Sequence, residues 1–189
     1  EADAVLAVGA EASLCPVVVA GLASAHALST NNDNPQTASR PFDKTRDGFV
    51  FGEGGGAILL ETETHAKTRG AQIKARLLGF ANSTDGYHVT APHPDGIGAV
   101  ACMDHAIQKA GIQKEKIDYI NTHGTSTPMG DVIETNAIKQ LFGAHAYEMA
   151  VTSTKGATGH MMGAGGVTET ITCVKAIQSG IIPPTLNLT

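Results

Sequence analysis

The stretch 117–131, Ile-Asp-Tyr-Ile-Asn-Thr-His-Gly-Thr-Ser-Thr-Pro-Met-Gly-Asp, decides the fold class of this 189-residue chain. It begins as a short strand pattern, continues as a Gly-, Thr- and Ser-rich loop around His123, and leads into a helical pattern. A second stretch repeats this order, with a strand at 150–152, the loop Ser-Thr-Lys-Gly-Ala-Thr-Gly-His at 153–160, and then an apolar helix. Loops of such units meet at the carboxyl ends of parallel strands, where α/β proteins bind ligands. We therefore predict an α/β fold that brings His123 and His160 to one site.

The rest of the chain alternates between strand and helix patterns. Alternating or β-branched runs predict strands, and apolar runs of helical period that end at Gly predict helices. Strands are predicted at 3–9, 48–51, 55–61, 73–81, 117–120 and 150–152, helices at 16–28, 62–69, 96–110, 131–142 and 163–178, and an extended end at 182–188. This alternation predicts a largely parallel sheet.

Composition and charge narrow the functional classes. Hydrophobic residues make up 42% and charged residues 16% of the chain, which is ordinary for a globular protein and unlike a disordered one. A net charge of −5 with scattered basic residues gives no reason to expect nucleic-acid binding. No apolar run approaches the roughly 20 residues of a membrane span, and the first residues lack the basic flank of a signal peptide. We therefore expect a cytoplasmic protein that does not associate with membranes.

The residue patterns give little support to cofactor or metal chemistry. Cys15, Cys102 and Cys173 share no CxxC spacing, so we interpret them as packing residues in a reducing compartment. His, Glu and Asp are available to a metal, but no HExxH or HxH pair occurs, and a lysine among them would repel a cation. The Gly-rich run 51–56 lacks the lysine of a P-loop and precedes a strand, so its glycines are expected to let two strands approach closely. We expect no cofactor and no metal.

The two histidine loops also contain a cation. Lys155 follows a strand and lies five residues before His160, so its side chain is expected to point into the same cleft. A cation beside two imidazoles lowers their pKa and keeps them neutral, and neutral imidazoles can donate N–H bonds to an oxyanion. A lone histidine is more often structural, but His123 and His160 on matching loops favour a functional site.

Two carboxylates accompany these loops, and each has two interpretations. Glu169 lies inside the apolar helix 163–178, either on a solvated face or as the buried partner of a cation. With Lys155 nearby in sequence we favour the ion pair, because a buried charge needs a partner. Asp131 stands at the start of the helix 131–142 and is either a catalytic carboxylate or simply the N-cap of that helix.

Three motifs in order carry a family resemblance: Arg-Pro-Phe-Asp-Lys-Thr-Arg-Asp-Gly-Phe-Val at 40–50, the His123 motif at 121–131, and the Lys155/His160 motif at 153–166. They resemble those of the β-ketoacyl-[acyl-carrier-protein] synthases, especially the type II, FabF-like condensing enzymes, and the resemblance covers essentially the whole chain. It implies a thiolase-like fold, in which two similar βαβαβαββ halves form a layered α/β/α/β/α sandwich. Residues 1–70 would belong to the late part of the first half and 71–189 to most of the second, so the fold is expected to be incomplete at both ends.

The resemblance also implies an activity and roles for the site residues. Such enzymes decarboxylate malonyl-carrier protein and condense the product with an acyl thioester held on a cysteine, in fatty acid or polyketide synthesis. By resemblance, His123 and His160 donate to the malonyl thioester carbonyl and stabilise the enolate, while Lys155 supports this electrostatics with Glu169 as its partner. The motif residues with an implied supporting role are Thr125, Thr127 and Asp131. The implied partner is acyl carrier protein, and the complete enzyme is expected to be a homodimer.

Two features of the family have no match in this chain. The nucleophilic cysteine of the family lies on a strand-to-helix elbow before the matched segment, and its terminal Gly-Phe-Gly-Gly loop lies after it. We therefore expect this chain to carry the decarboxylation part of the site and to be inactive in condensation by itself. Two other functions stay open: a non-catalytic subunit that binds a carrier protein, and a malonyl-thioester decarboxylase that needs no cysteine. The incomplete sheet is expected to expose apolar strands and to promote self-association.

Overall fold

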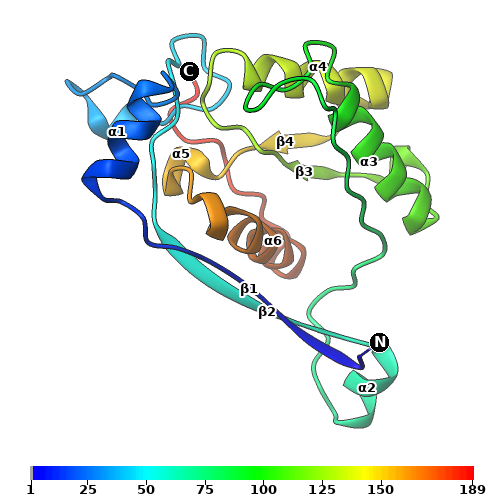
Figure 1. The fold of residues 1–189 in the computed structure, drawn as a ribbon. Coiled ribbons are helices and arrows are strands. Elements are labelled where there is room, and N and C mark those ends of the chain that lie inside the picture. The colour runs from blue at the N-terminus through cyan, green and yellow to red at the C-terminus, as the bar shows by residue number, and fades with distance from the viewer. Residues whose placement is uncertain (1) are drawn as a thin grey trace.

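A computed structural model describes residues 2–189 as a mixed α/β molecule with two separate two-stranded sheets (Figure 1). In the first sheet, β1 (Ala4–Glu11) pairs antiparallel with β2 (Gly54–Glu61) along their whole length. In the second sheet, β3 (Tyr119–Asn121) runs parallel to β4 (Ala150–Thr152). The predicted α/β class and the predicted parallel pairing of the two strands that precede the histidine loops are therefore confirmed.

Three longer helices pack around the two sheets. The helix α6 (Met162–Ser179) packs on both β1 and β2, and in Figure 1 it runs between this ribbon and the β3–β4 pair. The helices α3 (Ile97–Ala110) and α4 (Gly130–Phe142) pack against each other on the side of β3–β4 away from α6. Their apolar faces and the neighbouring strands form the main core cluster, which includes Ile138, Phe142, Met149, Met103, Ile107, Ile120 and Val151.

Short helices form the connections, and local sequence chemistry sets several of their ends. They are α1 (Pro16–Ser24), α2 (Glu63–Thr68) and α5 (Lys155–Thr158), with single 3-10 turns at Pro35–Thr37, Lys114–Lys116 and Gly143–Tyr147. Thr62 caps α2, where its Oγ1 accepts a hydrogen bond from the backbone N–H of His65. Gly111 and Gly180 end α3 and α6 in left-handed conformations that suit glycine.

Several predicted elements differ in the structure. The sheet is not largely parallel, because β1 and β2 form an antiparallel pair of their own. Residues 73–81 form no strand, and 48–51 make only single bridges, from Phe49 to Leu28 and from Phe51 to His160. A strand requires a partner with free backbone groups, and within residues 2–189 the segment 73–81 finds none. The helix predicted at 16–28 ends at Ser24, just before His26 adopts a left-handed φ of 52°.

The glycines of the run 51–56 serve a different contact from the predicted one. A methyl group added at Gly54 would lie 2.6 Å from Met161 Sδ, and one added at Gly56 would lie 3.1 Å from Ile171 Cδ1. On the facing strand, a methyl group at Gly9 would lie 2.7 Å from the carbonyl oxygen of Gly163. The glycines therefore let the β1–β2 ribbon approach the helix α6, rather than letting two strands approach each other.

Large apolar side chains remain exposed on several elements of the described chain. The β1–β2 ribbon exposes Val5, Leu6, Val8, Leu59 and Leu60. The helix α1 contains no buried residue, although its sequence is apolar up to its last residue, Ser24. The segment 73–81 exposes Leu77, Leu78 and Phe80 as well. The expected exposure of apolar strands is confirmed. Among the described residues, no helix combines the length and the apolar character that crossing a membrane requires.

Candidate active site

The structure brings the two predicted histidines together. Their ring centroids lie 5.2 Å apart, and the ring planes meet at 86°. Because β3 and β4 are parallel and in register, the loops that follow them leave the same edge of the sheet. The loops are also bonded to each other: the Ser153 hydroxyl donates to the carbonyl of Gly124 at 2.7 Å, and the backbone N–H of Thr122 donates to the carbonyl of Thr152 at 2.9 Å. The imidazoles are thus carried on a rigid double loop.

Lys155 is only 2% exposed, and its positive charge acts on both histidines. Its ammonium group forms an ion pair with the carboxylate of Glu169, which reaches it from the second turn of α6. The predicted ion pair is therefore present, and the alternative of a solvated Glu169 is wrong. The Ser39 hydroxyl donates to the carbonyl of Lys155 at 2.6 Å and ties this turn to the 34–46 loop.

The environment of both histidines favours the neutral imidazole. Burial, followed by the positive charge of Lys155, lowers the pKa of His160 to about 4. The pKa of His123 is lowered by the same two causes, with a smaller contribution from His160, although His123 itself is exposed in this chain. The predicted direction is confirmed, but burial contributes more than the cation on which the sequence argument relied.

Glu134 is part of the site, although the sequence analysis did not identify it. Its two carboxylate oxygens accept hydrogen bonds from the backbone N–H groups of His123 and Gly124, both at 2.8 Å. Burial raises the pKa of this carboxyl group, and the two backbone N–H groups oppose the shift. Glu134 lies one turn after Asp131 on α4. The sequence signal that could have identified it is a second carboxylate in the first turns of the helix that follows the His123 loop.

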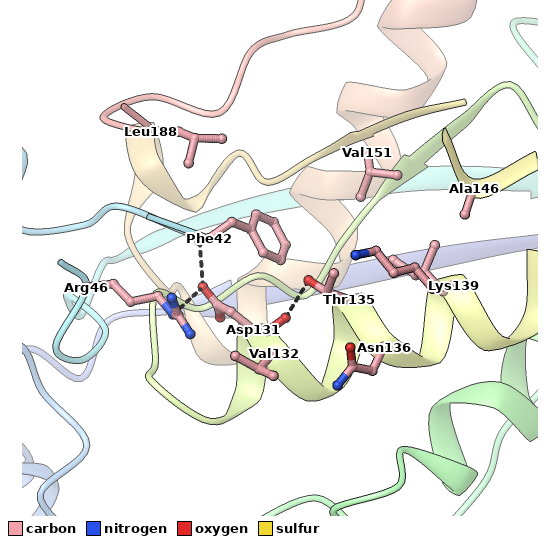
Figure 2. Close-up of a pocket in the computed structure, with 11 residues that line it drawn as sticks. Phe42, Arg46, Asp131, Val132, Thr135, Asn136, Lys139, Ala146, Val151 and Leu188 are labelled. Atoms are coloured by element: carbon pink, nitrogen blue, oxygen red, sulfur yellow. Dashed lines mark hydrogen bonds and ion pairs between the residues drawn. The ribbon is translucent and has the colours of Figure 1, made fainter. Parts of the chain in front are cut away.

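Asp131 is not the N-cap that the sequence offered as one of its two interpretations. The helix α4 begins at Gly130, its N-cap residue is Met129, and no side chain caps it. The carboxylate of Asp131 is 1% exposed and accepts a hydrogen bond from the backbone N–H of Phe42 at 2.8 Å (Figure 2). It also accepts one from the backbone N–H of Ser126 at 3.1 Å. Both of these residues have left-handed φ values, 66° and 70°. Asp131 therefore fixes two unusual backbone conformations and joins the 40–50 motif to the His123 loop.

A second link between these motifs is made by Arg46. Its guanidinium donates to the carbonyls of Thr127 at 2.9 Å and Pro128 at 2.6 Å, and its Nε lies 3.5 Å from Asp131. The Thr125 and Thr127 hydroxyls are 3.0 Å apart, so they bond to each other within the loop. Beside this link lies a cavity of about 390 Å³, lined by Phe42, Arg46, Asp131, Val132, Thr135, Asn136, Ile138, Lys139, Ala146, Val151 and Leu188 (Figure 2).

The three cysteines differ from one another in exposure. Cys15 is exposed just before α1, while Cys102 and Cys173 are partly buried within α3 and α6. Burial raises the pKa of the Cys173 thiol and so disfavours its reactive thiolate form. Among residues 2–189, no group of three or more His, Cys, Asp or Glu side chains is arranged to hold a metal ion.

Comparisons with known proteins match both parts of the chain. The family described as "Beta-ketoacyl synthase, C-terminal domain" matches residues 74–189, and the N-terminal domain of the same synthases matches residues 1–66. The chain is 51% identical over 188 residues to 3-oxoacyl-[acyl-carrier-protein] synthase 2 of Coxiella burnetii, covering 100% of this chain and 45% of that protein. The corresponding enzyme of Synechocystis sp. is 51% identical over 187 residues, with 99% and 45% covered.

Solved structures show the same relationship. One is a type II polyketide ketosynthase in complex with its acyl-carrier protein, with a TM-score of 0.96 and 39% identity, covering 100% of this chain and 46% of that one. A β-ketoacyl synthase of Burkholderia phymatum has a TM-score of 0.91 and 40% identity, with 99% and 44% covered. The chain thus spans about half the length of its curated relatives. The family models, the curated relatives and the solved structures all point to the same family. The chain therefore belongs to the β-ketoacyl synthase family.

Proposed function

We propose that the protein is a condensing acyltransferase of fatty acid synthesis and that this chain supplies its decarboxylation site. The observation that carries the proposal is the pair of imidazoles 5.2 Å apart, near the buried cation Lys155. Two neutral N–H donors this close together suit a single oxygen atom that gains negative charge during a reaction. A malonyl thioester presents such an oxygen when it loses carbon dioxide.

The proposed reaction is the decarboxylation of a malonyl thioester, followed by attack of the resulting enolate. The bond between the malonyl carboxylate and its α-carbon breaks, carbon dioxide leaves, and the bonding electron pair moves into the thioester group to form an enolate. His123 and His160 donate N–H bonds to the enolate oxygen, and the fixed charge of Lys155 favours the negative product. Removal of one such donor commonly costs about 3 kcal/mol of transition-state stabilisation. The enolate carbon can then attack an acyl thioester, which forms the new carbon–carbon bond and releases the thiolate.

Three further proposals concern the carrier protein, the oligomeric state and the acyl-accepting thiol. The curated relatives are named for acyl-carrier protein, and one similar ketosynthase was solved bound to its acyl-carrier protein. We therefore propose that the malonyl group arrives on acyl carrier protein. From the family resemblance alone we also propose that the whole protein is a homodimer. We also propose that the acyl-accepting thiol is supplied from outside residues 2–189. Cys102 and Cys173 sit inside helices, and the exposed Cys15 comes later in the chain than the nucleophile that the family resemblance implies. Sedimentation of the natural protein tests the dimer.

The test is carbon dioxide release from malonyl-carrier protein by the protein at its natural full length. We expect His123→Ala to abolish release, whereas His105→Ala, which removes an exposed histidine of α3, leaves the rate unchanged. Absence of release by the unchanged protein, with retained binding of carrier protein, would favour the non-catalytic subunit. Release without any condensation product, even with an acyl-carrier protein present, would favour a decarboxylase.

A further inference from the structure

The segment Gly48–Gly52, which we call the brace, connects the two histidine loops. The N–H of Gly48 donates to the carbonyl of Ser126 in the His123 loop at 3.1 Å. At its other end, the carbonyl of Val50 accepts from the N–H of His160 at 2.7 Å, and the N–H of Gly52 donates to the carbonyl of His160 at 3.1 Å. The brace therefore holds both backbone polar groups of His160.

Phe49 lies in the middle of the brace, and its ring touches that of the same histidine. The side chain is 7% exposed, and its ring centroid lies 5.2 Å from that of His160 with the planes at 70°. The backbone of Phe49 is itself fixed, since its N–H donates to Ala27 at 3.0 Å and its carbonyl accepts from Ser29 at 2.9 Å. Phe49, His160 and His123 thus form three successive edge-to-face rings.

The imidazole of His160 lacks the usual means of orientation. A functional histidine normally has its plane and tautomer set by a hydrogen bond at the ring nitrogen that faces away from the ligand. In His160, Nδ1 is buried and has no hydrogen-bond partner among the described residues. Packing must therefore hold the ring, and the aromatic neighbour on the brace is Phe49. Edge-to-face contacts of this kind have a preferred geometry, so they can fix a plane as well as fill space.

We propose that Phe49 is a positioning residue that fixes the plane of the His160 imidazole and keeps water from its inner side. The inference rests on the proposed function for its consequence in catalysis, but the contact itself is independent of that function. Excluding water from the inner side would contribute to the burial that lowers the pKa of His160 to about 4. The ionisable groups that the structure places near the ring are His123 and Lys155 with its partner Glu169, and none of them changes when Phe49 is replaced.

Phe49→Leu tests the proposal, with Phe142→Leu as the matched control. Phe142 is 4% exposed in the core cluster of α4, so its replacement creates a similar defect away from the site. We expect Phe49→Leu to raise the pKa of His160 by about one unit, because water reaches the vacated space. NMR titration of ¹³C-labelled histidine in the protein at its natural full length measures this pKa, and the His160→Gln variant assigns the signal. Phe142→Leu should leave the pKa unchanged while lowering the melting temperature by a similar amount.

Carbon dioxide release provides a second readout. We expect Phe49→Leu to lower kcat about tenfold with KM for malonyl-carrier protein unchanged, because ring orientation matters in the transition state more than in binding. If Phe49→Leu does not fold, Phe49→Met fills the space with a flexible side chain and is measured in the same way. An unchanged His160 pKa in the Phe49 variant, or an equal shift in Phe142→Leu, would overturn the proposal. If the unchanged protein releases no carbon dioxide, the proposed function fails, yet the titration still decides whether Phe49 positions His160.

Discussion

At the scale of single residues, the site depends on keeping two imidazoles uncharged near a buried cation. His160 achieves this mainly through burial, with Lys155 as the second cause. The folded pKa of His160 is lowered from its ordinary value of 6.5 to about 4, so the folded protein keeps the neutral ring in acid where an unfolded chain would take up a proton. The contribution of His160 to stability is therefore present above pH 6.5 and is lost progressively as the pH falls toward 4.

The same shift predicts the pH dependence of carbon dioxide release. The rate is expected to stay constant from neutral pH down to about pH 5 and to fall as the pH passes through about 4, where His160 becomes charged. Initial rates measured in a series of buffers at constant ionic strength check this limb, with circular dichroism showing that the protein remains folded. An acid limb near pH 6.5 would mean that the imidazoles titrate as they do in water.

The ion pair of Lys155 with Glu169 predicts a large effect on stability. Lys155→Met leaves the carboxylate of Glu169 without its partner in a mostly buried place, which typically costs about 3–5 kcal/mol in the free energy of unfolding. Lys67→Met on α2 is the matched control, because its partner Glu63 is exposed and water screens the pair, so that its loss changes stability little.

Urea unfolding of both variants and of Lys155→Met/Glu169→Gln measures these costs. We expect the double variant to lose less than the sum of its single variants, because neither charge is then left alone. Equal losses for Lys155→Met and Lys67→Met would show that the buried pair contributes no more than a surface pair.

At the scale of elements, close contact between the β1–β2 ribbon and α6 holds the two parts of the chain together. Gly9→Ala would place a methyl group 2.7 Å from the carbonyl oxygen of Gly163, and helix backbone cannot move away as a flexible side chain can. We expect a loss of about 1–3 kcal/mol in the free energy of unfolding, as for other overpacked contacts. Gly55→Ala is the control on the facing strand, where the added methyl group would lie at an ordinary 3.5 Å from Gly9 O. Thermal and urea unfolding should separate the two variants, and a Gly9→Ala protein as stable as Gly55→Ala would contradict the contact.

The predicted and observed secondary structures differ most in the strands. Residues 73–81 carry a strand pattern, yet they form no strand among the described residues because a strand needs a second strand beside it. The helix α4, in contrast, was predicted to within one residue of its start, because Gly130 and its apolar period are local signals. Local chemistry therefore predicts where α4 begins, whereas partners distant in sequence decide whether residues 73–81 form a strand.

At the scale of the whole molecule, the exposed apolar elements predict association. The β1–β2 ribbon and α1 present large apolar side chains to solvent, including Leu6, Val8 and Val17. Exposed patches of this kind mark surfaces that other protein covers. We expect residues 1–189 produced alone to self-associate, with a sedimentation coefficient and a melting temperature that rise with concentration. A monomer with a sharp melting transition that does not depend on concentration would contradict this expectation.

The sequence by itself determined the α/β class, the two loops that carry His123 and His160, the buried cation, and the family. These follow from local patterns, since strand, loop and helix signals lie next to one another and the motif residues are contiguous. Only the tertiary structure decided that Glu134 holds the backbone of His123, that Asp131 joins two loops, and that Phe49 packs on His160. Such contacts join residues from 11 to 111 positions apart, and a carboxylate or an aromatic ring can bond or pack with many partners. Only the folded chain shows which partner lies close enough to each carboxylate or ring to form a contact.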